Sequence, residues 1–199
     1  MTTKRQKTYF CINFLRMDYT TLLNSFLQDI RENPNVTAFR HNEEIVTNAL
    51  YTQRIAPIMN ELDTFPEDRF ALLLEREIQN YVAIPAAFFT GKIIVPISLD
   101  WTEQQRQQVL AREGLTTYLT AQRMHYYFRM TYEDALDRID NGLNTLHNDQ
   151  PVAVLYHFDN EGNASSETLT FQEIRQNGKK AFMPQETLAI FDFLTDKLR

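Results

Sequence analysis

Apolar residues at helical spacing make the segment after Asp18 the clearest element of the chain. Between positions 19 and 30 they fall on one face of a helix: Tyr19, Leu22, Leu23, Phe26, Leu27 and Ile30. Asp18 suits the cap of this helix, because its side chain can accept a hydrogen bond from a first-turn N–H group. Pro34 disfavours helical backbone in the residue before it, so we expect the helix to end at Asn33–Asn35.

Five further segments carry helical spacing or helix-end signals: 41–54, 66–81, 102–113, 131–146 and 184–198. Pro57 is expected to break or kink the first of them, with 58–62 as a continuation. The second begins with a proline and two acidic residues, which suit a first helical turn. The third ends at Gly114, a residue that accepts the left-handed backbone found after helices.

Short apolar or alternating runs predict the strands. They are Tyr9–Leu15, Ala86–Phe89, Lys92–Ser98, Arg123–Met130, Val152–Phe158 and Glu167–Ile174. Thr90-Gly91 suggests a hairpin between the second and third runs, and Pro96 predicts an edge or a bulge for the third, because proline cannot donate to a ladder. A polar loop, 159–166, predicts a hairpin between the last two runs. Asn177-Gly178 suggests a further tight turn before a weak strand.

These elements predict an α+β fold with a mixed or antiparallel sheet, packed helices and a mainly helical N-terminal part. The expected organisation is a single domain over 1–199. A helical subdomain 1–82 beside a mixed subdomain 83–199 is the alternative, although no flexible linker marks that boundary.

Composition removes several function classes. The five glycines are too far apart to form a dinucleotide fingerprint or a phosphate-cradling loop. A net charge of −6 works against non-specific attraction to nucleic acid, and the single cysteine, Cys11, rules out an internal disulfide and a cysteine-rich metal site. The apolar run 9–15 is shorter than a signal peptide needs, and no stretch is long enough to span a bilayer. We therefore expect a cytoplasmic protein with no membrane association.

We expect no cofactor and no metal. Glu133, Asp134 and Asp137 have the outline of a diphosphate–magnesium box, but acidic residues are also typical of a first helical turn. Asp159, Glu161 and Asn163 alternate like the start of a calcium loop. Gly162 is misplaced for that motif and Thr170 stands where its glutamate should be, so a solvated loop is favoured.

One strand face is the candidate ligand-binding surface. In an extended 123–130, Arg123, His125, Tyr127 and Arg129 point to the same side and place two guanidinium groups, an imidazole and a phenol in one row. Such a row suits phosphate, carboxylate or a nucleic-acid base. The simpler interpretation, which we favour, is that both arginines pair with surface carboxylates.

The favoured function is a non-enzymatic binding protein that acts through a protein partner as an accessory, regulatory or inhibitor subunit. Its acidic surface would complement a basic partner. The first alternative is nucleic-acid or nucleotide binding on the 123–129 face. The second is a hydrolase with His125 as general base and a carboxylate from Glu133, Asp134 or Asp137.

Overall fold

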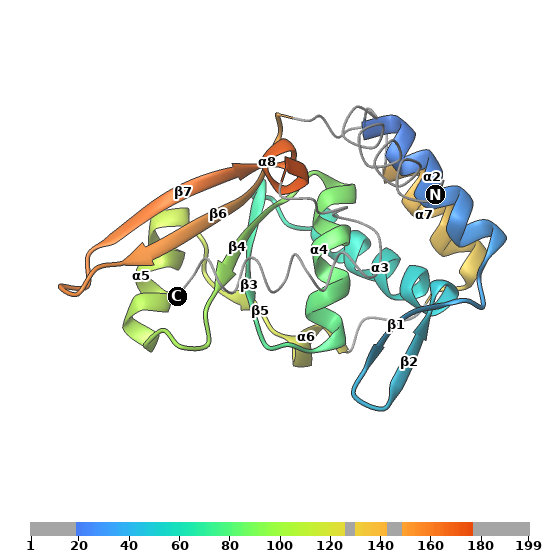
Figure 1. Cartoon of the computed structure of the whole chain (residues 1–199). Coiled ribbons are helices and arrows are strands. Elements are labelled where there is room, and N and C mark those ends of the chain that lie inside the picture. The colour runs from blue at the N-terminus through green and yellow to red at the C-terminus, as the bar shows by residue number, and fades with distance from the viewer. Residues whose placement is uncertain (1–18, 126–129, 143–148, 177–199) are drawn as a thin grey trace, which may run out of the picture.

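The computed structural model describes residues 19–125, 130–142 and 149–176 and confirms the α+β prediction (Figure 1). The elements are α2 (Tyr19–Glu32), β1 (Thr37–His41), β2 (Glu44–Thr47), α3 (Asn48–Asp63), β3 (Arg69–Leu73), α4 (Ile78–Thr90), β4 (Ile93–Ile97), α5 (Glu103–Glu113), β5 (Tyr118–Leu119), α6 (Ala121–His125), α7 (Tyr132–Gly142), β6 (Pro151–Phe158), β7 (Ala164–Thr170) and α8 (Phe171–Gln176). No helix among these residues is long and apolar enough to cross a membrane.

The main sheet is mixed and has the strand order β5-β3-β4-β6-β7, while β1 and β2 form a separate hairpin. The pairs β5–β3, β3–β4 and β4–β6 are parallel, and β6–β7 is antiparallel. The pairing is uneven along this order. β3 and β4 share five register pairs, whereas β4 and β6 share one, Ile94 with Ala153. Among the parallel pairs of long strands, the joint between β4 and β6 therefore has the fewest register pairs.

Two crossover helices cover the sheet. α4 connects β3 to β4 in one direction and α5 connects β4 to β5 in the other, so right-handed crossovers put these helices on opposite faces. α3 packs on α4, and α2 and α7 pack on α3 (Figure 1). Sandwiched between the sheet and α3, α4 buries nearly all of its residues, which explains why its sequence is apolar all round.

The prediction of a helix over 41–54 is wrong in its first half. Residues 37–47 form the β1–β2 hairpin, in which His41 lies opposite Glu44, and α3 begins only at Asn48 behind the Thr47 cap. Pro57 lies inside α3, which continues to Asp63, so the expected continuation beyond the proline is confirmed.

The prediction of a helix over 66–81 followed by a hairpin is also wrong. Residues 69–73 are β3 and residues 78–90 are α4, so the apolar run 86–89 is helical. Gly91 does not turn a hairpin; it ends α4 with φ +68° and leads into β4. Pro96 lies inside the sheet opposite Leu72, not at an edge, in the strand whose pairing to β6 is sparse.

Other predictions are confirmed. Thr102 caps α5 through a reciprocal box with Gln105, and Gly114 ends this helix with φ +69°. Thr131 accepts a hydrogen bond from the Asp134 N–H group at the start of α7. The predicted hairpin is present as β6–β7, although β7 begins at Ala164 within the predicted loop 159–166 and ends at Thr170, and 171–176 is helical.

Some predictions lie outside the described residues: the strand 9–15, the turn at Asn177-Gly178 and the helix 184–198. The 82/83 position falls within α4, and the division into two subdomains stays a prediction. The described core is one hydrophobic cluster that contains side chains from both sides of that position, such as Phe26 and Phe171.

Candidate functional site

The predicted row of ligand-binding side chains is not extended at its start. Arg123 and His125 lie on the short helix α6, where residues two apart point about 200° away from each other. They therefore do not share a face, and the strand prediction is wrong for these positions. Tyr127 and Arg129 lie outside the described residues, so the role of the four residues as a ligand-binding surface stays a prediction.

Both described members of the row already contact other side chains. Arg123 Nη2 lies 3.7 Å from Glu61 Oε1 of α3, which is a surface ion pair of the kind that the simpler interpretation expects. His125 Nδ1 lies 3.3 Å from Gln79 Nε2 of α4. The two side chains thus extend from α6 toward α3 and α4 respectively.

His125 lines a pocket of about 240 Å³, which we call the α3–α4 pocket. Four elements supply its walls: β2, α3, α4 and α6. The lining residues are Glu44, Gln53, Arg54, Pro57, Ile58, Gln79, Val82, Met124 and His125. The carboxylate that shares this lining with His125 is Glu44, rather than Glu133, Asp134 or Asp137 of the hydrolase hypothesis.

Arg54 is the positive charge of the α3–α4 pocket. Its side chain is 14% exposed, and its Nη2 atom donates to Glu44. Its Nη1 atom is buried and has no hydrogen-bond partner among the described residues. A buried guanidinium donor without an acceptor costs free energy, so this atom marks a place where an acceptor would be stabilising.

In both predicted metal-binding motifs, a carboxylate accepts hydrogen bonds from residues close to it in sequence. Asp134 accepts a hydrogen bond from the Thr131 hydroxyl at the start of α7. Asp159 accepts hydrogen bonds from the N–H groups of Glu161 and Asn163, and those from Asn163 lower the pKa of the Asp159 carboxyl. In the part of the chain that the structure describes, no group of three His, Cys, Asp or Glu residues is arranged to hold a metal ion.

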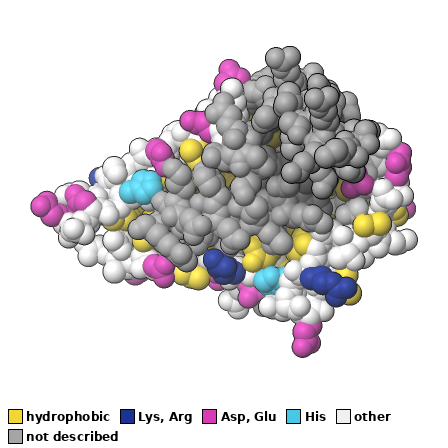
Figure 2. All heavy atoms as spheres, in the orientation of Figure 1, with side chains coloured by type: hydrophobic (Ala, Val, Ile, Leu, Met, Phe, Trp, Pro, Cys, Tyr) yellow, Lys and Arg dark blue, Asp and Glu magenta, His cyan; other side chains and the backbone are white. Residues whose placement is uncertain are grey.

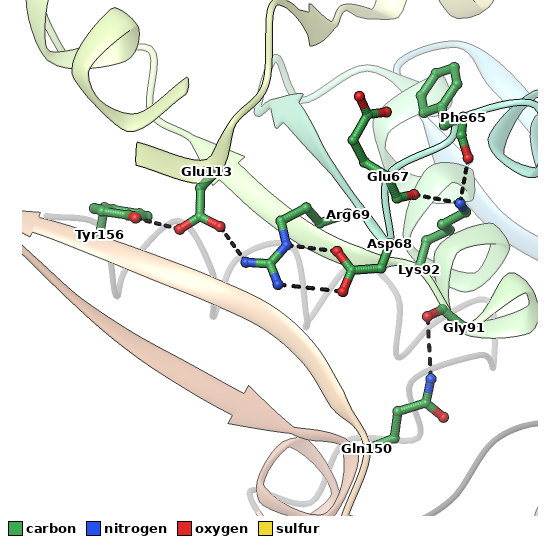
Figure 3. A network of polar contacts seen from close by, with 9 residues as sticks. All are labelled: Phe65, Glu67, Asp68, Arg69, Gly91, Lys92, Glu113, Gln150 and Tyr156. Carbon is green, nitrogen blue, oxygen red and sulfur yellow. Dashed lines mark hydrogen bonds and ion pairs between the residues drawn. The ribbon is translucent and has the colours of Figure 1, made fainter. Parts of the chain in front are cut away.

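A second polar site joins elements that are distant in sequence (Figure 3). Arg69 of β3 donates to Glu113 at the end of α5, and the Tyr156 hydroxyl of β6 donates to the other carboxylate oxygen. We call these three residues the Glu113 cluster. Arg69 also donates to Asp68 over 2.9 Å, which lowers the pKa of Asp68, while Lys92 Nζ donates to the backbone oxygen of Phe65 over 2.8 Å.

The Glu113 cluster spans the sparsely paired joint between β4 and β6. The Glu113 side chain is only 7% exposed, which makes its two partners necessary. Burial, together with the hydrogen bond to Glu113, raises the pKa of Tyr156 to about 12. The sequence carried no signal for this cluster, because its members are more than 40 residues apart and none belongs to a motif.

The end of the β6–β7 hairpin is an acidic surface. Figure 2 shows acidic side chains at the far left, over the tip of this hairpin, where Asp159 and Glu161 are exposed. Residues 151–170 contain three acidic residues and no lysine or arginine. The outer strand β7 exposes Ser165, Ser166, Glu167 and Thr168.

No model of a known protein family matches the chain. A stretch of 108 residues, 53% of the chain, is 27% identical to the Anguibactin system regulator of Vibrio anguillarum. The match covers 10% of that protein, so the chain spans about a tenth of the length of the curated relative.

The fold is similar to parts of adenylation domains and related synthetases. The adenylation domain AlmE of Vibrio cholerae, in complex with glycyl-adenosine-5'-phosphate, superimposes with a TM-score of 0.61 at 13% identity, over 78% of this chain and 36% of AlmE. The N-terminal subdomain of Klebsiella oxytoca NpsA gives 0.55 at 14% identity, over 78% and 42%. Bacillus subtilis o-succinylbenzoate CoA synthetase gives 0.53 at 17% identity, over 76% and 43%. At these identities the similarity shows the fold alone.

Proposed function

We propose that this chain is a non-enzymatic, cytoplasmic binding module that regulates a protein partner, and that the β6–β7 hairpin is its docking element. Two findings support the proposal. The sequence similarity is to a protein named as a regulator. The hairpin combines a strand, β7, that pairs with β6 alone among the described strands with an excess of acidic residues over lysine and arginine.

The edge position of β7 in the described sheet is the observation that carries the proposal. β7 is the last strand of the sheet order and pairs with β6 alone among the described strands. An edge strand presents unpaired N–H and C=O groups, to which an extended segment of another protein can add as a further strand. Natural edges are often protected by lysine, proline or a bulge. β7 contains neither lysine nor proline, and the irregularity in its ladder with β6 lies between Pro151 and Ala153, at the end away from the hairpin tip.

Charge indicates the kind of partner. Asp159, Glu161 and Glu167 give the hairpin a negative surface, with His157 beside Glu167 at 3.4 Å as its one titratable base. Opposite charge accelerates encounter and selects against like-charged partners. The partner segment is therefore an extended and basic one.

The experiment is capture of partners from native cell extract by the tagged chain, with and without nuclease, followed by mass spectrometry. The affinity of a recovered protein is then measured for the wild type and for the double variant Glu161→Lys/Glu167→Lys. We expect charge reversal on the hairpin to weaken binding at least tenfold, about 1.4 kcal/mol, at low salt.

The matched control is Glu43→Lys/Glu133→Lys, which changes the net charge equally at exposed positions on other elements. Equal loss in the two double variants would attribute binding to overall charge and contradict the hairpin as docking element. Co-purification that nuclease abolishes would instead favour the nucleic-acid alternative and the 123–129 segment.

A further inference from the structure

We propose that the α3–α4 pocket is a binding site for a small organic anion, with the Arg54 guanidinium as its anchor. The site is independent of the hairpin and goes beyond the proposed protein binding. It adds a small-molecule ligand, of the carboxylate or phosphate class, to the functions of the chain.

The first argument is the unsatisfied donor. Arg54 presents five N–H donors in a planar fork, and only its Nη2 atom has a described acceptor, Glu44. The Nη1 atom is buried without an acceptor in the described part of the chain. Carboxylate and phosphate oxygens are the acceptors that match this fork best. Because the Nη1 atom is closed off from solvent, the guanidinium has to rotate away from Glu44 to donate to a bound anion.

The second argument is the division of the lining into polar and apolar halves. Gln53, Gln79 and His125 are the polar residues beside Arg54, with Gln53 Nε2 donating to the Met130 backbone oxygen and Gln79 Nε2 lying 3.3 Å from His125 Nδ1. The apolar wall consists of Pro57, Ile58, Val82 and Met124. Ligand sites commonly combine an apolar wall with a few polar groups that fix orientation. The volume of about 240 Å³ lies below the range of roughly 300–1,000 Å³ typical of drug-sized ligands, so the ligand body is about as large as one aromatic ring.

Glu44 limits the affinity of the α3–α4 pocket for an anion. Its carboxylate forms an ion pair with Arg54, and its side chain is 44% exposed. The carboxylate can therefore move into solvent when an anion takes its place. As long as it remains, its charge repels a second anion. Removing that charge without changing the shape of the side chain is therefore expected to strengthen binding.

The test uses the full chain and three probes with the same ring: benzoate, phenyl phosphate and the neutral benzyl alcohol. Dissociation constants come from NMR titration and from the rise in Tm with ligand concentration. We expect one or both anions to bind at millimolar concentration and benzyl alcohol to bind more weakly. Glu44→Gln should lower the Kd by at least about threefold, the effect of removing a unit charge about 6 Å away in water.

Arg54→Gln should abolish anion binding, whereas Arg31→Gln, which removes the same charge from an exposed pair with Asp140, should leave it unchanged. Binding of benzoate alone identifies a carboxylate ligand, and binding of phenyl phosphate alone identifies a phosphate ligand. The proposal is overturned if neither anion binds, or if Arg54→Gln binds as the wild type does. If Arg54→Gln fails to fold, Glu44→Gln decides, and an unchanged or higher Kd in that variant overturns the proposal.

Discussion

The Tyr156 hydroxyl on β6 donates a hydrogen bond to the carboxylate of Glu113, the last residue of α5. Because the same carboxylate accepts from Arg69 on β3, α5 connects two strands that β4 separates. Arg112 extends the connection by donating to the backbone oxygen of Ala164 in β7 over 2.7 Å. The end of α5 thus supports the part of the sheet where ladder pairing is sparse.

Removal of the Glu113 charge should destabilise the fold. We expect Glu113→Gln to lower the free energy of unfolding by about 1.5–3 kcal/mol, because a hydrogen bond to a charged group is lost and Arg69 is left with a weaker acceptor. Urea unfolding measures the change. Glu103→Gln, at an exposed position in the first turn of the same helix, is the control and should cost less than about 1 kcal/mol.

Tyr156 should make stability sensitive to alkaline pH. Its pKa is raised from the ordinary 10.0 to about 12, so the folded chain retains a proton that the unfolded chain loses. This contribution is fully present below pH 10 and is lost as the pH rises through 12. The urea midpoint should therefore fall more steeply between pH 10 and 12 for the wild type than for Tyr156→Phe. Parallel curves for the two proteins would show that Tyr156 has no raised pKa.

Asn80 should be essential to the loop between β3 and α4. It is fully buried, donates to the backbone oxygen of Leu73 over 2.6 Å and accepts from the N–H group of Glu77 over 3.3 Å. Asn80→Leu leaves both backbone groups without this partner and should cost about 2 kcal/mol in urea unfolding. Asn80→Asp keeps the acceptor and loses the donor. Wild-type stability in that variant would argue against the bond to Leu73.

Gly142 should tolerate no side chain. A Cβ atom there would lie 2.6 Å from Met59 Cε and 2.7 Å from the backbone oxygen of Phe89, so α7 would have to move away from α3 and α4. We expect Gly142→Ala to cost about 3 kcal/mol. Gly114→Ala meets no atom within 4 Å and bears only the strain of φ +69°, about 1 kcal/mol. Thermal unfolding of both variants checks this order.

Arg123 should matter little for stability. Its side chain is 45% exposed and its ion pair with Glu61 is 3.7 Å long, so Arg123→Ala should change the free energy of unfolding by less than about 0.5 kcal/mol. A titration with single-stranded nucleic acid at low salt uses the same variant. The nucleotide-binding alternative predicts salt-sensitive binding that weakens in Arg123→Ala and Arg129→Ala, and equal binding in all three proteins would reject it.

Elements whose first or last residues carry a local sequence signal were predicted correctly. The polar helical range 102–113 with its Gly114 end signal placed α5, and the helical range 131–146 placed the start of α7. α4 was missed because its two-sided burial removes the polar face that marks a helix, so its apolar run resembled a strand. The parallel order of the sheet was missed for the same reason, since the crossover helix between β3 and β4 was not recognised.

The candidate site was predicted less well than the fold. His125 was predicted to belong to a ligand-binding strand face, and that role stays a prediction; alternation in 123–130 suggested a strand where residues 121–125 form α6. Arg54 and Glu113 carried no local signal, because the pocket and the cluster arise only when distant segments pack. A single sequence does not encode such proximity in its spacing.

The single register pair between β4 and β6 has a consequence for how the molecule opens. Because β4 and β6 share a single register pair, we expect the β6–β7 ribbon to separate from β4 before β3 does. Native-state hydrogen exchange should then report two cooperative units, with the amides of the ribbon exchanging through a lower-energy opening than those of β3. Loss of the Tyr156 hydroxyl would accelerate exchange in the ribbon alone, which makes α5 the regulator of that opening.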